Sequence, residues 1–292
     1  MRKNVSGGSM SIPSITSTQL SLSYCRNTKP DINFHSHEEY EIYYFHGGEC
    51  NYIIGDQIHI LSPGDLILMH GLTLHRPKTF ENKEYHRTTL HFDQVHFRGV
   101  LRQMGMEYLL NPFFSLQSYR ISFRDVKKEE VEQLFLSMNQ FKQMDDAISQ
   151  YRFQLAFLDM LAFLYPYCQE SLAYNSEPQS EKEKNVQKII TFIESHYKED
   201  ITLDQLGEVL FLSKYYLVKI FKEVTGVTIF NYLFHRRINQ AKIELLMNTK
   251  LSITELSYLI GFKHPSHFSK VFKEITGVTP EHYKEVIKAK MP

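Results

Sequence analysis

The sequence predicts a two-domain α+β protein: an antiparallel β-barrel with a helical pair, followed by an all-α domain with two helix–turn–helix units. Two observations lead to this prediction. Apolar and polar residues alternate up to about residue 95, and helical periodicity follows from there on. The segment FKEVTGVT at residues 221–228 returns as FKEITGVT at residues 272–279. A repeat of this size indicates two copies of one supersecondary unit.

Length and charge are consistent with two domains of different character. A chain of 292 residues is long enough to bury two cores. Net charge is zero, but residues 181–292 carry 17 Lys and Arg against 13 Asp and Glu, a net of +4, which leaves −4 on residues 1–180. The repeat therefore lies in the basic part, as phosphate contacts require. Because the excess is modest, we expect tight binding of nucleic acid to need two copies of the chain.

Cysteine content and hydropathy indicate a soluble cytoplasmic protein. Cys25, Cys50 and Cys168 form neither a zinc-binding pattern nor a disulfide framework. The first residues lack the apolar core of a signal peptide. The most apolar run, residues 153–168, is too short to span a bilayer. We therefore expect no membrane partner.

Short alternating runs make up the first domain, predicted at residues 19–169 after a flexible lead-in at residues 1–18. The runs are separated by Gly, Pro, Asp and Asn, which is typical of an antiparallel barrel or sandwich. The expected strands are residues 20–24, 40–45, 51–55, 57–61, 65–69 and 86–92.

Two amphipathic helices are predicted to follow, at residues 127–143 and 146–165. Apolar side chains cover most of the second helix, so we expect the pair to pack on the barrel and to form a homodimer interface. The alternative is a purely internal core. Residues 170–183 are polar and charged and predict a linker. The second domain, residues 184–290, is predicted to begin with a helix at residues 184–197.

Each copy of the repeat predicts a helix, a turn and a second helix. Residues 202–205 and 252–255 fit the capping box that begins a helix. The second helices end at Gly226 and Gly277, the residue type that favours the left-handed conformation after a helix. Residues 229–248 form one helical pattern between the units.

The exposed faces of the two second helices are predicted to contact DNA. They carry Lys, Ser, His and Tyr, with no acidic residue before Glu223 and Glu274. A connecting helix of 20 residues spans about 30 Å, so the two units could enter successive major grooves of B-DNA. The candidate contacts are Lys214, Tyr215, Val218, Lys219 and Lys222 in the first unit and His264, Ser266, His267, Lys270 and Lys273 in the second.

This second domain resembles the AraC/XylS family of bacterial transcription regulators. The resemblance rests on SKYYLVKIFKEVTG at residues 213–226, on the spacing of Arg237, Ala241, Leu245 and Leu246, and on IGFKHPSHFSKVFKEITGVTPEHY at residues 260–283. It implies RNA polymerase as a further partner and base readers early in each second helix. By position, these readers are Tyr215, Val218, Lys219, Ser266, His267 and Lys270.

Two positions depart from the family pattern. The turn of the first unit has Leu210 where the second unit has Gly261. Val218 stands where a polar base reader is often found, which limits it to a thymine methyl group or to no contact.

The first domain contains the motif H-x-H-x3-E-x6-G at residues 35–48, followed by P-G-D at residues 63–65 and by His75. These residues resemble the two motifs of the cupin superfamily, so the expected barrel is cupin-like. In enzymes of that superfamily two histidines, a carboxylate and a third histidine bind one metal ion. The corresponding candidate set here is His35, His37, Glu41 and His75.

Domains of this kind attached to AraC-type DNA-binding regions often keep the motif and generally act as sensors of small molecules. We therefore favour a ligand pocket over a metal centre and expect no required cofactor. Tyr and His side chains would suit a sugar or another polar metabolite. The candidate lining is His35, His37, Glu41, Tyr43, Phe45, Tyr52 and His75.

The sequence thus predicts a dimeric transcription regulator that is not an enzyme. Its expected partners are double-stranded promoter DNA, a small-molecule effector, a second copy of the chain and RNA polymerase. Two alternatives stay open. A metal-binding cupin enzyme fused to a DNA-binding domain predicts bound metal, and an effector-independent DNA-binding dimer predicts a barrel interior filled by large side chains.

Overall fold

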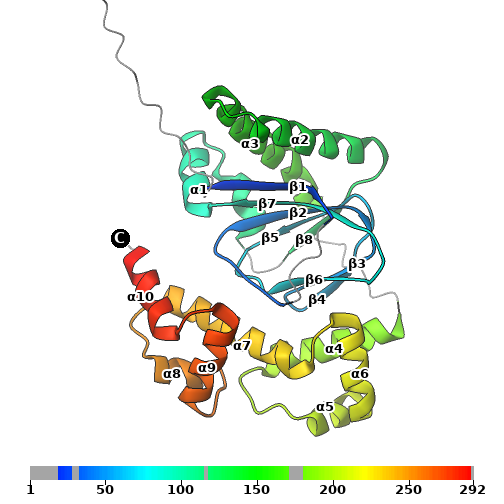
Figure 1. The fold of residues 1–292 in the computed structure, drawn as a ribbon, viewed down its shortest axis with the longest axis vertical. Helices are drawn as coiled ribbons and strands as arrows, with labels where there is room; N and C mark the ends of the chain where they lie inside the picture. The colour runs from blue at the N-terminus through cyan, green and yellow to red at the C-terminus, as the bar shows by residue number, and fades with distance from the viewer. Residues whose placement is uncertain (1–18, 28–32, 115–117, 171–179, 291–292) are drawn as a thin grey trace, which may run out of the picture.

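The computed structural model describes residues 19–27, 33–114, 118–170 and 180–290. A layer of β-sheet lies between a helical pair on one side and an array of helices on the other (Figure 1). The predicted lead-in at residues 1–18 and most of the predicted linker at residues 170–183 lie outside the described residues. Within the described part, no helix is long and apolar enough to cross a membrane.

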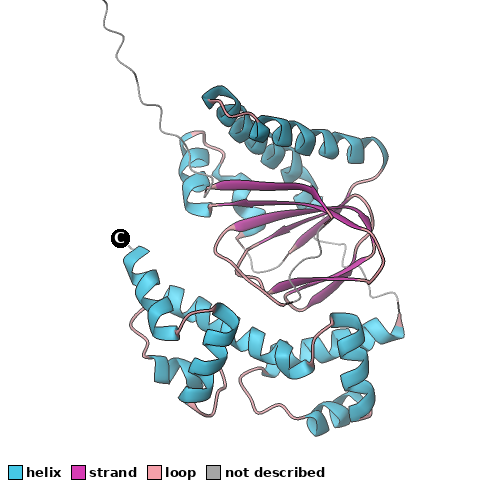
Figure 2. Ribbon diagram, in the orientation of Figure 1, coloured by secondary structure: helices cyan, strands magenta, loops and turns pink. Residues whose placement is uncertain are grey.

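Two antiparallel sheets face each other (Figure 2). The larger sheet has the strand order β1 (Leu20–Arg26), β7 (Tyr85–Phe92), β2 (Tyr40–Gly48), β5 (Asp65–Met69) and β8 (Tyr119–Ser122). The smaller sheet has the order β4 (Gln57–Ile60), β3 (Cys50–Ile54) and β6 (His75–Thr79). This arrangement confirms the predicted antiparallel β-domain.

All six expected strands are present, and β6 and β8 are two that the sequence did not predict. Pro77 lies inside β6, opposite Tyr52. A proline breaks the pattern of a strand and is tolerated on a sheet edge, where its missing N–H costs no ladder bond. Pro77 interrupts the strand pattern, so the sequence did not predict β6. The proline is nevertheless compatible with β6, because β6 is an edge strand.

Large side chains fill the space between the sheets. Tyr43, Phe45, Tyr52 and Tyr85 are each at most 3% exposed, and the hydroxyl of Tyr43 donates to that of Tyr85 at 3.0 Å. The rest of this core is Cys50, Ile54, Leu61, Ile67 and Met69. The interior of the sandwich is therefore closed by aromatic packing.

The outer face of the larger sheet is covered by helices. These are α1 (Gln94–Gln103), the 3₁₀ segment η1 (Glu107–Phe113), α2 (Asp125–Gln143) and α3 (Ala147–Glu170). Phe92 of β7 packs against Phe97 of α1 and Phe157 of α3, with ring centroids 5.9 and 4.8 Å away. The expectation that the helical pair packs on the sheet is thus confirmed.

Seven helices follow, and they hold the repeat. They are α4 (Glu181–His196), α5 (Leu203–Leu210), α6 (Lys214–Thr225), α7 (Ile229–Met247), α8 (Ile253–Leu259), α9 (Pro265–Thr276) and α10 (Pro280–Lys290). The hydroxyl groups of Thr202 and Ser252 cap α5 and α8 as expected. Gly226 and Gly277 end α6 and α9 at φ of 76° and 82°. The two helix–turn–helix units are therefore α5–α6 and α8–α9.

The left-handed residue in the turn is at a different position in each unit, although the two copies of the repeat align without a gap. Gly261 takes the left-handed conformation in the second unit, with φ of 93°. In the first unit that conformation falls on Phe211, with φ of 56°, and not on Leu210. Helix α5 is one residue longer than α8, which moves the turn along the chain.

Candidate functional site

The face predicted to read DNA is open. All ten candidate contacts, on α6, on α9 and at its N-cap residue His264, are exposed. On the opposite faces, Leu217, Phe221, Phe268 and Phe272 are fully buried. This division follows from helical spacing, because the apolar side chains recur every three or four residues and draw one face inward. The other face remains available to a ligand.

Several candidate DNA contacts already have neighbours. Lys214 forms an ion pair with Asp204, and Nζ of Lys270 lies 3.9 Å from Oε1 of Glu274. The ring of His267 lies edge-on to Phe234 and Phe262, with centroids 5.5 and 5.4 Å away. Exposed ion pairs contribute little to stability, so the lysines can exchange them for phosphates or bases at small cost.

Helix α7 connects the two units and also contacts the sandwich. Its 19 residues span about 28 Å at 1.5 Å per residue. Tyr232 donates to the carbonyl of Gly55 at 3.0 Å, and the amide of Asn239 donates to the carbonyl of Leu72 at 2.8 Å. Nζ of Lys242 donates to the carbonyl of Ser36 at 2.8 Å. One helix therefore connects both helix–turn–helix units and contacts the sheet domain.

Apolar and charged contacts extend this interface to α6 and α4. Phe34 and Leu74 belong to the same buried cluster as residues of α4, α6 and α7. The guanidinium of Arg76 donates to the carbonyl of Thr225 at the end of α6. Oε1 of Gln187 in α4 accepts from the backbone N–H of Ile58 at 3.1 Å.

A cavity of about 400 Å³ opens at this interface, which we call the α7 cavity. The segment 34–39 and Leu74 form its wall on the sandwich side. The opposite wall comes from α7, the end of α9 and α10, through His235, Ile238, Asn239, Lys242, Ile275, Thr276 and Tyr283. Burial lowers the pKa of Lys242 to about 8, so an ammonium group is held there at a cost in solvation.

A second cavity of about 430 Å³, the α9 cavity, lies beside the first. It shares Phe34, His35, His235 and Ile275 with the α7 cavity. Its far wall includes His267 and Lys270, two of the predicted base readers. A single stretch of the sandwich, residues 33–35, thus faces both α7 and the second DNA-reading helix.

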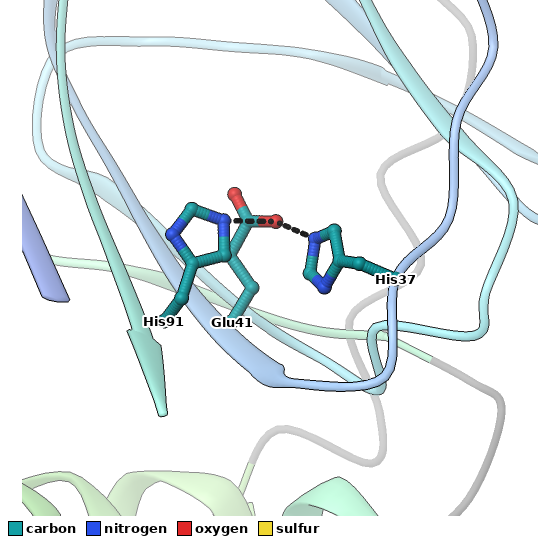
Figure 3. A group of neighbouring side chains, drawn as sticks. All are labelled: His37, Glu41 and His91. Carbon is teal, nitrogen blue, oxygen red and sulfur yellow. Dashed lines mark hydrogen bonds and ion pairs between the residues drawn. The ribbon is translucent and has the colours of Figure 1, made fainter. Parts of the chain in front are cut away.

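Three histidines surround the carboxylate of Glu41. Nε2 of His37 lies 3.1 Å from Oε2 of Glu41, and Nε2 of His75 and of His91 each lie 3.4 Å from the same oxygen. Figure 3 shows His37 and His91 pointing at this oxygen from either side. The side chains of Glu41 and His75 are 4% and 0% exposed, whereas those of His37 and His91 are 22% and 32% exposed.

The charge of this group depends on its histidines. Burial alone would raise the pKa of Glu41, but the imidazoles of His37, His75 and His91 outweigh it and hold that pKa well below the ordinary value. Burial would lower the pKa of His91, and the hydrogen bond and charge of Glu41 raise it instead. Glu41 is therefore an anion surrounded by nitrogen atoms.

The seven candidate ligand-binding residues separate into three places. His35 and His37 line the α7 cavity. Tyr43, Phe45 and Tyr52 lie in the closed core between the sheets. Glu41 and His75 form the buried base of the histidine group.

Several residues at these sites were not among the sequence candidates, and four of them bear most on the chemistry. They are His91, His235, Asn239 and Lys242. His91 lies directly opposite Glu41 on the neighbouring strand β7, a relation that requires the strand register. The three α7 residues belong to a helix that the sequence predicted, but its contact with the sandwich carries no local signal.

Comparison with known proteins finds one matching family model in each domain of the chain. Residues 20–138 match the AraC-like ligand binding domain family, and residues 206–285 match a helix-turn-helix domain family. The uncharacterized HTH-type transcriptional regulator YdiP of Escherichia coli (strain K12) is 25% identical over 269 residues, covering 91% of this chain and 86% of that protein.

Two further proteins are similar to this chain. The uncharacterized HTH-type transcriptional regulator YbfI of Bacillus subtilis (strain 168) is 27% identical over 234 residues, which is 80% of each chain. The transposon Tn10 TetD protein of Escherichia coli is 32% identical over 99 residues, covering 34% of this chain and 71% of that protein. The chain belongs to the AraC family of transcription regulators and joins an AraC-like ligand-binding domain to a DNA-binding domain with two helix–turn–helix units.

Proposed function

We propose that this regulator binds its effector in the α7 cavity and that the effector alters how α6 and α9 engage DNA. The observation that carries the proposal is the composition of the cavity wall, which comes from the ligand-binding domain on one side and from α7, α9 and α10 on the other. A ligand touching both walls has a different affinity for each arrangement of the two domains. Such a difference is what shifts a population between two states.

Both walls of the α7 cavity carry polar side chains. His35 and His37 come from the ligand-binding domain, and Asn239 and Lys242 come from α7. Oδ1 of Asn239 and Nδ1 of His235 are buried without a hydrogen-bond partner among the described residues. A polar metabolite with hydroxyl groups, which can donate to Oδ1 of Asn239, would satisfy them, which supports the expectation of a sugar or similar molecule.

The test is a thermal-shift screen of the full chain against sugars and small carboxylic acids. We expect a ligand that stabilises the protein and that loses affinity in Lys242→Gln but not in Lys250→Gln, an exposed lysine just beyond α7. The same ligand should change affinity for a DNA site selected from a random pool. A ligand that binds equally well to both variants would place the effector site elsewhere.

For the DNA-binding domain, we propose that both units read bases through the ten exposed residues named above. The support is their exposure on two helices at the ends of α7. Selection of sites with the full-length protein should enrich two sequence blocks about one helical turn apart. A single enriched block would mean that one unit only holds the backbone.

The remaining assignments are also proposals. We place the ligand-binding domain at residues 19–169 and the DNA-binding domain at residues 184–290, with a linker at residues 170–183. We propose that the protein acts in the cytoplasm as a homodimer, recruits RNA polymerase and has no enzymatic activity. Relatives named as transcriptional regulators support this reading.

One observation favours a second candidate function, an effector-independent DNA-binding dimer. The space between the sheets is filled by Tyr43, Phe45, Tyr52 and Tyr85, as that alternative predicts. It differs from the main proposal at the α7 cavity, where it expects no ligand. A screen without any stabilising ligand, together with full DNA binding by the purified protein, would favour it.

A further inference from the structure

We propose that the two DNA-reading helices select chemically different bases: α6 covers the methyl groups of thymines, whereas α9 forms hydrogen bonds with the edges of guanines. The argument compares matched positions in the two copies of the repeat. Phe221 and Phe272 occupy the same place in the two copies, so matched positions differ by 51 residues. The inference rests on the proposed function, in which both units read bases, and adds the class of base that each unit selects.

The exposed face of α6 is apolar at positions where that of α9 is polar. Tyr215 and Val218 are three residues apart, so they share one face of the helix, and they are 78% and 38% exposed. The matched positions on α9 hold Ser266 and Ser269. The residue that follows each pair is a lysine in both helices, so it does not distinguish them. The apolar side chains are therefore what sets α6 apart.

A third apolar side chain lies at the N-terminal end of α6. Phe211 is 93% exposed and precedes Ser213, the N-cap residue of this helix, by two positions. Its φ of 56° belongs to the left-handed conformation, which is unusual for a bulky residue and free of strain for glycine. Because almost none of the side chain is buried, packing does not offset this strain. A strained residue that the core does not use is typical of a functional site.

The major groove distinguishes these two kinds of helix face. Thymine presents its C5 methyl group there, and contact with an apolar side chain removes that methyl group from water. The N-terminal residues of a recognition helix are the ones that reach base edges, and Phe211, Tyr215 and Val218 belong to this end of α6. Phenylalanine and valine have no hydrogen-bonding side-chain group, so they leave the donors and acceptors of a G·C pair without partners.

The N-terminal end of α9 instead carries hydrogen-bonding groups. Ser266, His267 and Lys270 are exposed. Lysine donates to O6 and N7 of guanine, and a serine hydroxyl either donates or accepts. The ring of His267 is held edge-on against Phe234 and Phe262, so its orientation is set before DNA binds. This face suits guanine and gains little from a methyl group.

The test replaces thymine by deoxyuridine, which lacks only the methyl group, in the DNA site that the full-length protein selects from a random pool. We expect affinity, measured by fluorescence anisotropy, to fall about fourfold for each methyl group that α6 covers, the value of burying one carbon group. Deoxyuridine in the other block, or in the spacer between the blocks, should leave the affinity unchanged. In that other block, 7-deazaguanine should weaken binding, because it lacks the N7 acceptor.

Three variants assign these effects to side chains. The double variant Tyr215→Ser with Val218→Ser gives α6 the residues of the matched positions on α9, and it should bind thymine and deoxyuridine sites equally. Lys270→Ala should keep the loss caused by deoxyuridine and reduce the one caused by 7-deazaguanine. Phe211→Gly should bind the selected site about fourfold more weakly. It should melt no earlier than wild type, because glycine adopts the left-handed conformation without strain.

Four results would overturn the inference. They are a selected site with no thymine in either block, equal affinity for thymine and deoxyuridine in every block, a deoxyuridine loss that persists in the double variant, and wild-type affinity in Phe211→Gly. The proposed function fails in a different way. Enrichment of a single block would show that one unit reads no bases, and the deoxyuridine comparison would still decide whether α6 covers methyl groups in that block.

Discussion

Single lysines on the DNA-reading helices separate base contacts from phosphate contacts. Lys219 and Lys270 are exposed on α6 and α9, and we predict that Lys219→Ala and Lys270→Ala each weaken binding to the selected site by about 1–3 kcal/mol. The expected loss is smaller on random DNA, because a base contact distinguishes sequences. Fluorescence anisotropy on both DNAs measures the difference. Lys188→Ala, an exposed lysine of α4, is the matched control, and equal losses on both DNAs would make the two lysines phosphate contacts.

A buried histidine makes the domain interface sensitive to acid. Burial and then the charge of Arg76 lower the pKa of His235 to about 4, from about 6.5 in an unfolded chain. Below pH 6.5 the unfolded state takes up a proton that the folded state refuses, so stability falls as pH falls. We predict that about 2 kcal/mol is lost between pH 7.5 and 5 through this residue, at 1.36 kcal/mol per pKa unit.

Denaturant unfolding at the two pH values, in wild type and His235→Gln, measures this contribution. The variant should lose less stability on acidification than wild type. The exposed His282 provides the control, since His282→Gln should keep the wild-type pH dependence. If His235→Gln loses as much stability on acidification as wild type, other buried histidines carry the whole effect. His59, whose pKa is also lowered to about 4, is one of them.

At the scale of elements, the two helix-ending glycines form a matched pair. Gly226 and Gly277 both have positive φ, so alanine at either costs about 1 kcal/mol. A Cβ at Gly277 meets nothing within 4 Å, but one at Gly226 would lie 2.8 Å from Nη2 of Arg76. We predict that Gly226→Ala also displaces Arg76 and loosens the contact between α6 and the ligand-binding domain. Limited proteolysis should show faster cleavage for Gly226→Ala than for Gly277→Ala, and equal rates would contradict a role for Arg76 in holding α6.

The elements themselves were largely predictable, because hydrophobic period and capping residues are local. The expected strands and the DNA-reading helices appear where the period places them. Three features were not predicted, because they depend on more than the local sequence pattern. Pro77 hid β6, the longer α5 moved the turn from Leu210 to Phe211, and the register of β2 with β7 brought His91 to Glu41. The histidine group was therefore predicted in part, through His37, Glu41 and His75.

For the whole molecule, the unpredicted feature is the direct contact of the two domains. Among the described contacts between the domains, Gly55, Leu72 and Ser36 each accept a hydrogen bond from α7. Because α7 carries both helix–turn–helix units, a small shift of this helix against the sandwich moves both DNA-reading helices together. An effector bound between the two surfaces would therefore act directly on α7.

The same arrangement leaves α3 free for the predicted dimer, since it packs on the opposite side of the sandwich (Figure 1). Ile148 and Leu155 on α3 are 66% and 62% exposed, and they lie two helical turns apart, so both side chains are on one face of the helix. We predict that Leu155→Asp changes a dimer into a monomer in light scattering and weakens binding to a two-block DNA site, because each chain then binds alone. Val95→Asp, on α1, where Val95 is 77% exposed but lies outside the helical pair, should remain dimeric. Dimers that persist in Leu155→Asp would move the dimer interface away from this face of α3.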